Sequence, residues 1–260
     1  TSWAALVGQW FDEKFGAGTA TNAVIHHKNG GIGATGSFFG SYRLAKYCRF
    51  DTAPSDLLFI EFAINDLYDH RNKEQVQRDM ESMILQTYQA NPYANIILLF
   101  TSDFSRRDTD YDAIIWHKEI AEHYQIPYIY LGAPLWKKVV AENGGVTPIS
   151  ASSNIWRKYV TDDVHPNDLG YAFYASLITD YLEYQLLSSD IQRDNSYNKK
   201  ILPTSTVSDK KTIKVNTNYA SFKDAGFTNA VLGDWEFIPE TTYITCAKAG
   251  GSFQFKFTGT

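Results

Sequence analysis

The run Asp56-Leu57-Leu58-Phe59-Ile60-Glu61-Phe62 is almost entirely apolar and has the length of one strand. A strand that is apolar on both sides must be covered on both sides, as in a parallel sheet between helices. Two further apolar runs, at 96–101 and 128–131, follow segments with helical periodicity. Because strands and helices alternate along the chain, we predict an α/β fold with a parallel sheet.

The helices expected around these strands have apolar residues at helical spacing and capping residues at their ends. We place them at 2–15, 42–47, 72–89, 110–124, 135–142 and 168–187, with one more strand at 23–27. Residues 188–211 are rich in Ser, Asp, Asn and Lys, which predicts a linker. Short alternating runs at 212–215, 235–238, 243–246 and 253–257 predict a β-rich module. The expected domains are therefore 1–187, a linker at 188–211, and a module at 212–260 that is cut short.

The composition limits the partners that the protein can have. The chain has 260 residues and a net charge of -5, without a run of Lys and Arg, which argues against nucleic acid as the main partner. No apolar run has the length of a membrane span. The histidines show no metal-ligand spacing, so no metal is expected. No cofactor is expected either. Cys48 and Cys246 are far apart in sequence, and either a disulfide or two free thiols would fit.

A candidate general base lies in Thr161-Asp162-Asp163-Val164-His165-Pro166-Asn167. A carboxylate that orients an imidazole fixes its tautomer and stabilises the imidazolium formed when a proton is taken up. Pro166 keeps a helix from starting before Asn167 or Asp168 can cap it, so the histidine is held at a loop tip. The alternative is a simple capped turn.

Two other segments offer hydrogen-bond donors. Gly31 to Gly36 matches G-x-G-x-x-G, for which a dinucleotide site, a tight turn, or a backbone amide for an anionic transition state are the alternatives. Asn65 follows the carboxyl end of a buried strand, where open α/β sheets place their ligands. Its carboxamide can donate to a developing oxyanion, or it can close an Asx turn.

Together, these segments resemble the SGNH, or GDSL-type, esterase and lipase family over Thr1 to about Leu187. Residues 29–36 resemble the family's glycine block, 62–66 its Gly-x-Asn-Asp block with Ala63 in place of the glycine, and 162–166 its Asp-x-x-His block. The resemblance implies a three-layer, flavodoxin-like fold. It also implies that Asp162 orients His165, and that an oxyanion hole combines the Asn65 side chain with a backbone amide of Gly33 or Ala34. Asp163 is the alternative acid.

The Gly-Asp-Ser block that names the family is missing from these residues. We expect the nucleophilic serine, on the first strand of the sheet, to lie upstream of Thr1. The serines at positions 2, 37 and 41 are poor substitutes, because they belong to helix starts. In the family the first strand lies between the second and third, so its loss would leave one edge of 23–27 and one edge of 56–62 unpaired.

The resemblance implies hydrolysis of an ester through an acyl-enzyme. Family members with an added β-module often act on acetylated sugars, so we expect a small acyl ester, such as an acetylated saccharide, as the substrate. The sequence shows no apolar lid of the kind that a lipase needs. Trp156 would line the pocket or belong to the core. A catalytically inactive carbohydrate-binding relative and a nucleotide-dependent oxidoreductase remain as alternatives. The localisation is open, with a secreted or bacterial cell-envelope protein among the possibilities.

Overall fold

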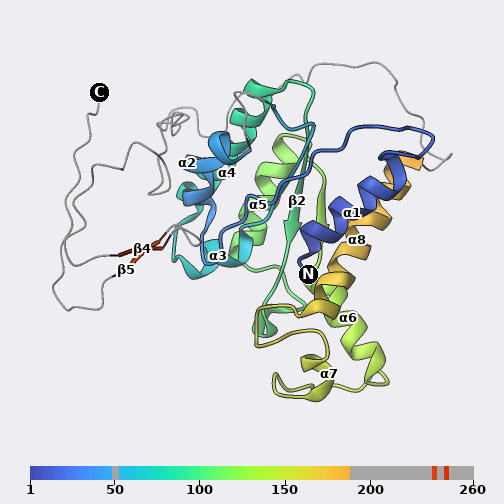
Figure 1. Cartoon of the computed structure of the whole chain (residues 1–260). Coiled ribbons are helices and arrows are strands. Elements are labelled where there is room, and N and C mark those ends of the chain that lie inside the picture. Colours follow the sequence, from blue (N-terminus) through green and yellow to red (C-terminus); the bar gives the residue numbers. More distant parts are fainter. Residues whose placement is uncertain (49–52, 188–235, 239–242, 246–260) are drawn as a thin grey trace. The chain divides into compact units, whose positions relative to one another are not determined.

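The computed structural model describes residues 1–48, 53–187, 236–238 and 243–245 (Figure 1). Its parallel sheet has the order β1-β2-β3, formed by Leu57–Ile60, Asn95–Phe100 and Tyr128–Tyr130. In the register, Leu57 lies opposite Asn95 and Leu98 opposite Tyr128, so the carboxyl ends of the strands point to one edge. The predicted α/β fold with a parallel sheet is confirmed.

Helices cover both faces of this sheet (Figure 1). Alternate residues of β2 point to opposite faces, so that Leu98 belongs to one hydrophobic core and Leu99 to the other. The first core is covered by α2 (Ser37–Tyr47), α3 (Ala63–Tyr68), α4 (Lys73–Ala90) and α5 (Asp112–His123). The second is covered by α1 (Trp3–Phe15), α6 (Gly132–Glu142) and α8 (Asp168–Leu187). Two short helices, η1 (Phe104–Arg106) and α7 (Asn154–Arg157), lie in the loops after β2 and α6.

The strand expected at 23–27 is not formed, and residues 22–32 belong to no helix or strand. The backbone amide of Ala23 donates to the carbonyl of Phe15, which fastens the segment to the end of α1. The order of the described sheet leaves β1 at an edge, without a strand through which this segment could join. The helix expected at 42–47 begins earlier, at Ser37, because a carboxylate from α3 caps its start.

The chain divides into two compact units, Thr1–Val215 and Asn216–Thr260. In the second unit, two of the short runs expected to be strands form β4 (Glu236–Ile238) and β5 (Tyr243–Thr245), which pair in antiparallel orientation. The runs at 212–215 and 253–257, the linker at 188–211 and Cys246 lie outside the described residues, so the domain boundaries stay a prediction. Among the helices that the structure describes, none has the length and apolar character needed to cross a membrane.

Candidate active site

Asp162 and His165 form a hydrogen-bonded pair. Oδ2 of Asp162 lies 2.8 Å from Nδ1 of His165, and Oδ1 accepts bonds of 2.7 Å from the backbone amides of Val164 and His165. Partial burial raises the pKa of Asp162, but the two backbone amides and the imidazole together lower it to about 2. The carboxylate is therefore ionised at neutral pH. The imidazole that it orients is 72% exposed, within reach of a large ligand.

The loop that carries this pair is fixed on both sides. The carbonyl of His165 accepts a bond of 2.8 Å from the amide of Thr161, which closes the turn. The side chain of Asn167 accepts bonds from the amides of Leu169 and Gly170, at 3.0 and 3.2 Å, and so caps α8. The loop tip is therefore held between a closed turn and a capped helix.

Two neighbours of the pair have structural roles. Asp163, the alternative acid, forms an ion pair of 3.1 Å with Arg157, so the geometry favours Asp162 as the partner of His165. Trp156 is 2% exposed and belongs to the core rather than to a pocket. Its Nε1 donates a hydrogen bond of 3.1 Å to the backbone carbonyl of Asp162 and thereby anchors the loop to the core.

Asn65 lies in the first turn of α3, because β1 ends at Ile60 and the helix begins at Ala63. Its Nδ2 donates a hydrogen bond of 2.8 Å to the backbone carbonyl of Thr35. A carboxamide has two N–H donors, and this bond uses one of them. The bond ties the glycine-rich loop to the start of α3, so the structure brings Asn65 and this loop together.

Within the glycine-rich loop, Ala34 has a φ of 56°, in the left-handed region that favours glycine. The resemblance aligns Ala34 with a glycine, and the backbone here has the conformation that a glycine adopts readily. Gly33 and Ala34 are both exposed. The loop therefore presents its backbone to solvent beside Asn65.

A carboxylate occupies the amino end of α2. Oδ1 of Asp66 accepts a bond of 2.7 Å from the amide of Ser37, and Oδ2 lies 2.8 Å from Nε2 of His117. Both side chains of this Asp66–His117 pair are buried. Asp69 also approaches, because a Cβ added to Gly36 would lie 2.3 Å from its Oδ2. These carboxylates lie where a pyrophosphate would have to bind, so the geometry opposes the dinucleotide interpretation of the loop.

The loop after β2 connects the two halves of the candidate site. The hydroxyl of Tyr68, at the end of α3, donates a bond of 2.7 Å to Oδ2 of Asp103, which is buried. The amide of the next residue, Phe104, donates a bond of 2.8 Å to the carbonyl of Asp163. The helix that carries Asn65 and the loop that carries the Asp–His pair are thus fastened to the same segment.

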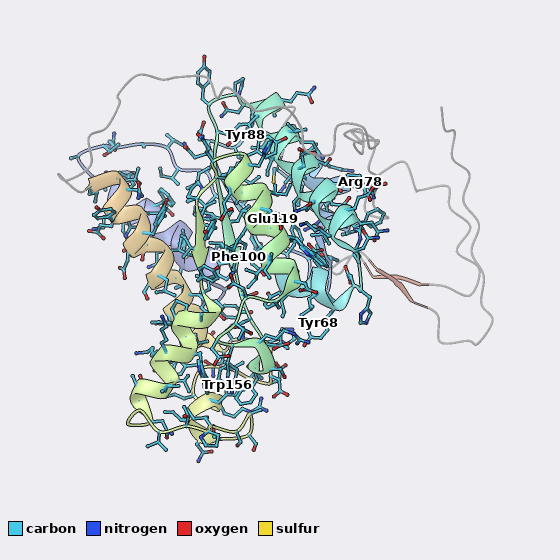
Figure 2. The ribbon with its side chains drawn as sticks, turned by 180° about the vertical axis from the view of Figure 1, so that it is seen from behind. Tyr68, Arg78, Tyr88, Phe100, Glu119 and Trp156 are labelled. Atoms are coloured by element: carbon cyan, nitrogen blue, oxygen red, sulfur yellow. The ribbon has the colours of Figure 1, made fainter. Side chains whose placement is uncertain are left out.

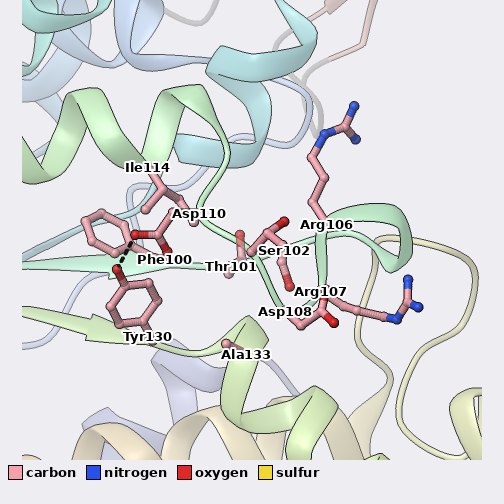
Figure 3. Close-up of a pocket in the computed structure, with 11 residues that line it drawn as sticks. Phe100, Thr101, Ser102, Arg106, Arg107, Asp108, Asp110, Ile114, Tyr130 and Ala133 are labelled. Carbon is pink, nitrogen blue, oxygen red and sulfur yellow. Dashed lines mark hydrogen bonds between the residues drawn. The ribbon is translucent and has the colours of Figure 1, made fainter. Parts of the chain in front are cut away.

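A small pocket lies beside this segment, at the carboxyl ends of β2 and β3 (Figure 3). Thr101, Arg106 and Asp110 line it together with Tyr130, whose hydroxyl is 2.9 Å from Oδ2 of Asp110. Arg106 also contacts Asp103. The pocket therefore adds polar groups to the strand tips next to the loop that carries the Asp–His pair.

Glu61 is a further acidic group at the strand tips, directly after β1. The hydroxyl of Thr101 donates a bond of 2.8 Å to its Oε1. Burial raises the pKa of Glu61 to about 7, against the opposing effect of this bond.

The three serines at positions 2, 37 and 41, which were considered as substitutes for the nucleophile, have structural roles. The side chain of Ser2 caps α1, with Oγ 3.4 Å from the amide of Ala5. The hydroxyl of Ser41 donates to the carbonyl of Phe38, and Ser37 is buried. Within the part of the chain that the structure describes, no group of three or more His, Cys, Asp or Glu side chains could hold a metal ion.

The sequence reasoning did not single out Glu61, Tyr68, Asp103 or Arg106 as site residues. One available signal was position, because Glu61 directly follows β1 and Asp103 lies three residues after β2, at the edge where ligands bind. Tyr68 offered only its spacing of three residues from Asn65, which places the two on neighbouring turns of one helix face.

A parallel sheet between two helical layers, with an oriented histidine beyond its carboxyl edge, is the architecture of the SGNH class of hydrolases. A family model described as the GDSL-like Lipase/Acylhydrolase family matches residues 1–173, and the chain belongs to this family.

Solved structures give the same fold. A two-domain esterase active on acetylated mannans, crystallised with mannopentaose, is 22% identical and superposes with a TM-score of 0.66, covering 97% of this chain and 60% of that one. A second structure, also of a two-domain esterase active on acetylated mannans, is 24% identical, with a TM-score of 0.62 and coverages of 96% of this chain and 61% of that one. The chain thus spans about three fifths of the length of these neighbours. A comparison with curated proteins found no match.

Proposed function

We propose that the protein is a serine ester hydrolase that removes small acyl groups, with an acetylated carbohydrate as its substrate. In this proposal His165 is the general base and Asp162 orients it. The oxyanion hole combines the Asn65 side chain with the backbone amide of Gly33 or Ala34. No metal or cofactor takes part in the reaction.

The observation that carries this proposal is the bond of 2.8 Å between Oδ2 of Asp162 and Nδ1 of His165. An ionised carboxylate at this position holds the proton on Nδ1, which leaves the lone pair of Nε2 free to accept a proton. The two backbone amides that bind Oδ1 keep the carboxylate from turning away. The pair is thus arranged as a general base.

The reaction then follows in two steps. Nε2 of His165 takes the proton of a serine hydroxyl as its oxygen attacks the ester carbonyl, and the resulting oxyanion accepts bonds from the Asn65 amide and the loop backbone. The C–O bond to the sugar then breaks, and the same imidazole gives the proton to the departing sugar oxygen, which leaves as a hydroxyl group. An acyl-serine remains. Water activated by His165 then cleaves this ester and releases the acid. In this proposal, the attacking serine belongs to a segment upstream of Thr1.

Two features support a carbohydrate ester as the substrate. The imidazole of His165 is 72% exposed, so that a polymer chain can reach it without entering a deep tunnel. The two-domain esterase with the same fold is active on acetylated mannans, which makes an acetylated mannooligosaccharide the first substrate to test.

The test uses the full-length protein with two substrates, 4-nitrophenyl acetate and an acetylated mannooligosaccharide. We expect His165→Ala to lower kcat by roughly 10³-fold or more on both, and Asp162→Asn to lower it strongly as well, because the tautomer is lost. Asp163→Asn is the matched control, since its carboxylate pairs with Arg157, and it should stay within a few-fold of wild type. Full turnover by His165→Ala would refute the proposal.

Labelling with a fluorophosphonate probe distinguishes the proposed hydrolase from the alternative, a catalytically inactive carbohydrate-binding relative. The probe forms a covalent bond only with an activated serine, and fluoride leaves as the bond forms. The wild-type protein should therefore gain the mass of the phosphonyl group on one serine peptide, and His165→Ala should label far more slowly. A wild-type protein that neither labels nor hydrolyses, yet binds mannopentaose in a calorimetric titration, would establish the inactive relative instead.

A further inference from the structure

Three residues form a compact group beside the candidate site, and we refer to Tyr68, Asp103 and Arg106 as the rim cluster. Asp103 is 2% exposed, and its Oδ2 lies 2.7 Å from the hydroxyl of Tyr68 and 2.5 Å from Nη1 of Arg106. Oδ1 of the same carboxylate accepts a bond of 2.8 Å from the Arg106 amide. One buried acid therefore fixes both a phenol and a guanidinium.

The two groups that Asp103 holds reach solvent. Tyr68 is 50% exposed, and the side chain of Arg106 is 37% exposed, with its guanidinium carbon over the Tyr68 ring at 6.0 Å from the centroid. Figure 2 labels Tyr68 at the periphery of the molecule, whereas Phe100 lies inside. The guanidinium lies over one face of the Tyr68 ring, so a half-exposed aromatic ring and N–H donors are presented together in a fixed geometry.

The position of the rim cluster relates it to the proposed catalytic groups. Tyr68 lies one helical turn beyond Asn65 on α3, and Asp103 directly precedes Phe104, whose amide is bonded to the loop of the Asp–His pair. The rim cluster therefore borders both the oxyanion side and the histidine side of the site.

The charges of the rim cluster favour an uncharged ligand. The ion pair between Arg106 and Asp103 offsets the charge of the guanidinium, so the group offers little net attraction to a carboxylate or phosphate. An exposed aromatic face suits the C–H face of a sugar ring, and the remaining N–H donors of a guanidinium suit hydroxyl groups. Because Asp103 already orders both side chains, little conformational entropy is lost when a ligand binds.

We propose that the rim cluster is a saccharide-binding subsite, in which a sugar ring of the substrate stacks on Tyr68 and donates to or accepts from the polar groups held by Asp103. This inference rests on the proposed function, because the subsite would set the specificity of that reaction. It assigns to the protein a preference for esters whose alcohol part is an oligosaccharide.

The test compares, in the full-length protein, kcat/KM on the acetylated mannooligosaccharide with kcat/KM on 4-nitrophenyl acetate, which carries no sugar. Tyr68→Ala should lower the ratio of the two about tenfold, mainly through KM on the saccharide. Tyr68→Phe keeps the ring but loses its bond to Asp103, so a smaller decrease is expected. Tyr184→Ala is the matched control, since this tyrosine on α8 is 54% exposed and should leave the ratio as in wild type.

The outcomes for the subsite and for the proposed function are distinct. An unchanged ratio in Tyr68→Ala would overturn the subsite even if hydrolysis of both substrates is observed. If the wild-type protein hydrolyses neither substrate, the proposed function fails, and calorimetric titration with mannopentaose decides the subsite alone. Binding by wild type that is weakened about tenfold in Tyr68→Ala would support the subsite, and equal binding or no binding would refute it.

Discussion

Replacing Glu61 with glutamine should change how the stability of the protein depends on pH. Burial is the largest influence on this carboxyl group, and nearby Asp66 adds to it, while the bond from Thr101 opposes both. Burial chiefly raises the pKa of Tyr111 and Tyr174, and the negative charge of Glu61 adds to the rise. The result is a folded-state pKa of about 7, compared with 4.5 for an ordinary glutamate.

The sign of this pH dependence of stability is set by whether the folded or the unfolded state binds the Glu61 proton more tightly. The folded protein keeps Glu61 protonated up to about pH 7, whereas the unfolded chain loses the proton near pH 4.5. The stabilisation is therefore fully present below pH 4.5 and is lost as the pH rises to 7. At about 1.36 kcal/mol per pKa unit, the shift corresponds to roughly 3 kcal/mol in all, of which about 2 to 3 kcal/mol is lost between pH 5 and pH 8.

The measurement is urea unfolding of the wild-type protein and Glu61→Gln at several pH values from 5 to 8. We expect the free energy of unfolding of the variant to rise relative to wild type by about 2 to 3 kcal/mol over this range. Glu142→Gln is the control, because the bond from Lys158 and its other neighbours hold the pKa of Glu142 at about 2, so it does not titrate there. A difference between Glu61→Gln and wild type that is constant with pH would refute the reasoning.

Three further predictions concern stability, measured by urea or thermal unfolding. Asp66→Ala leaves His117 buried without its partner and should cost about 3 to 5 kcal/mol, and a loss under 1 kcal/mol would contradict this account of the pair. Gly170→Ala should destabilise the protein by about 1 to 3 kcal/mol, because the added Cβ would lie 2.2 Å from the carbonyl oxygen of Tyr159. This cost should exceed the higher helix propensity of alanine. A variant more stable than wild type would contradict the close contact. Ala34→Gly should be neutral or stabilising by up to about 1 kcal/mol while Ala34→Val is destabilising, and the reverse order would argue against the left-handed backbone at this position.

Much of the fold could be predicted from local patterns. The apolar runs that became β1, β2 and β3 and the helices between them follow from periodicity within each segment. The strand expected at 23–27 did not form, because a strand also needs a neighbour, and the described sheet offers none for this segment. The early start of α2 depends on Asp66, which lies 29 residues away from Ser37 in sequence.

The candidate site could be predicted only in part for the same reason. Asp162 and His165 are three residues apart, so their pairing follows from the sequence of one turn. The contact between Tyr68 and Asp103 joins residues 35 positions apart in sequence, and it depends on the pairing of β1 with β2, which brings the segments after these strands together. Site residues that come from several different loops can therefore be identified only from the three-dimensional structure.

The bond between the amide of Phe104 and the carbonyl of Asp163 has a consequence for how this protein can diversify. A single short loop carries Asp103 and Arg106, two of the residues proposed to bind the sugar, and is hydrogen-bonded to the turn that carries the histidine. Insertions or deletions in this loop would change both the sugar-binding residues and the position of the histidine. New specificities are therefore more accessible through side-chain replacement within the loop than through changes in its length.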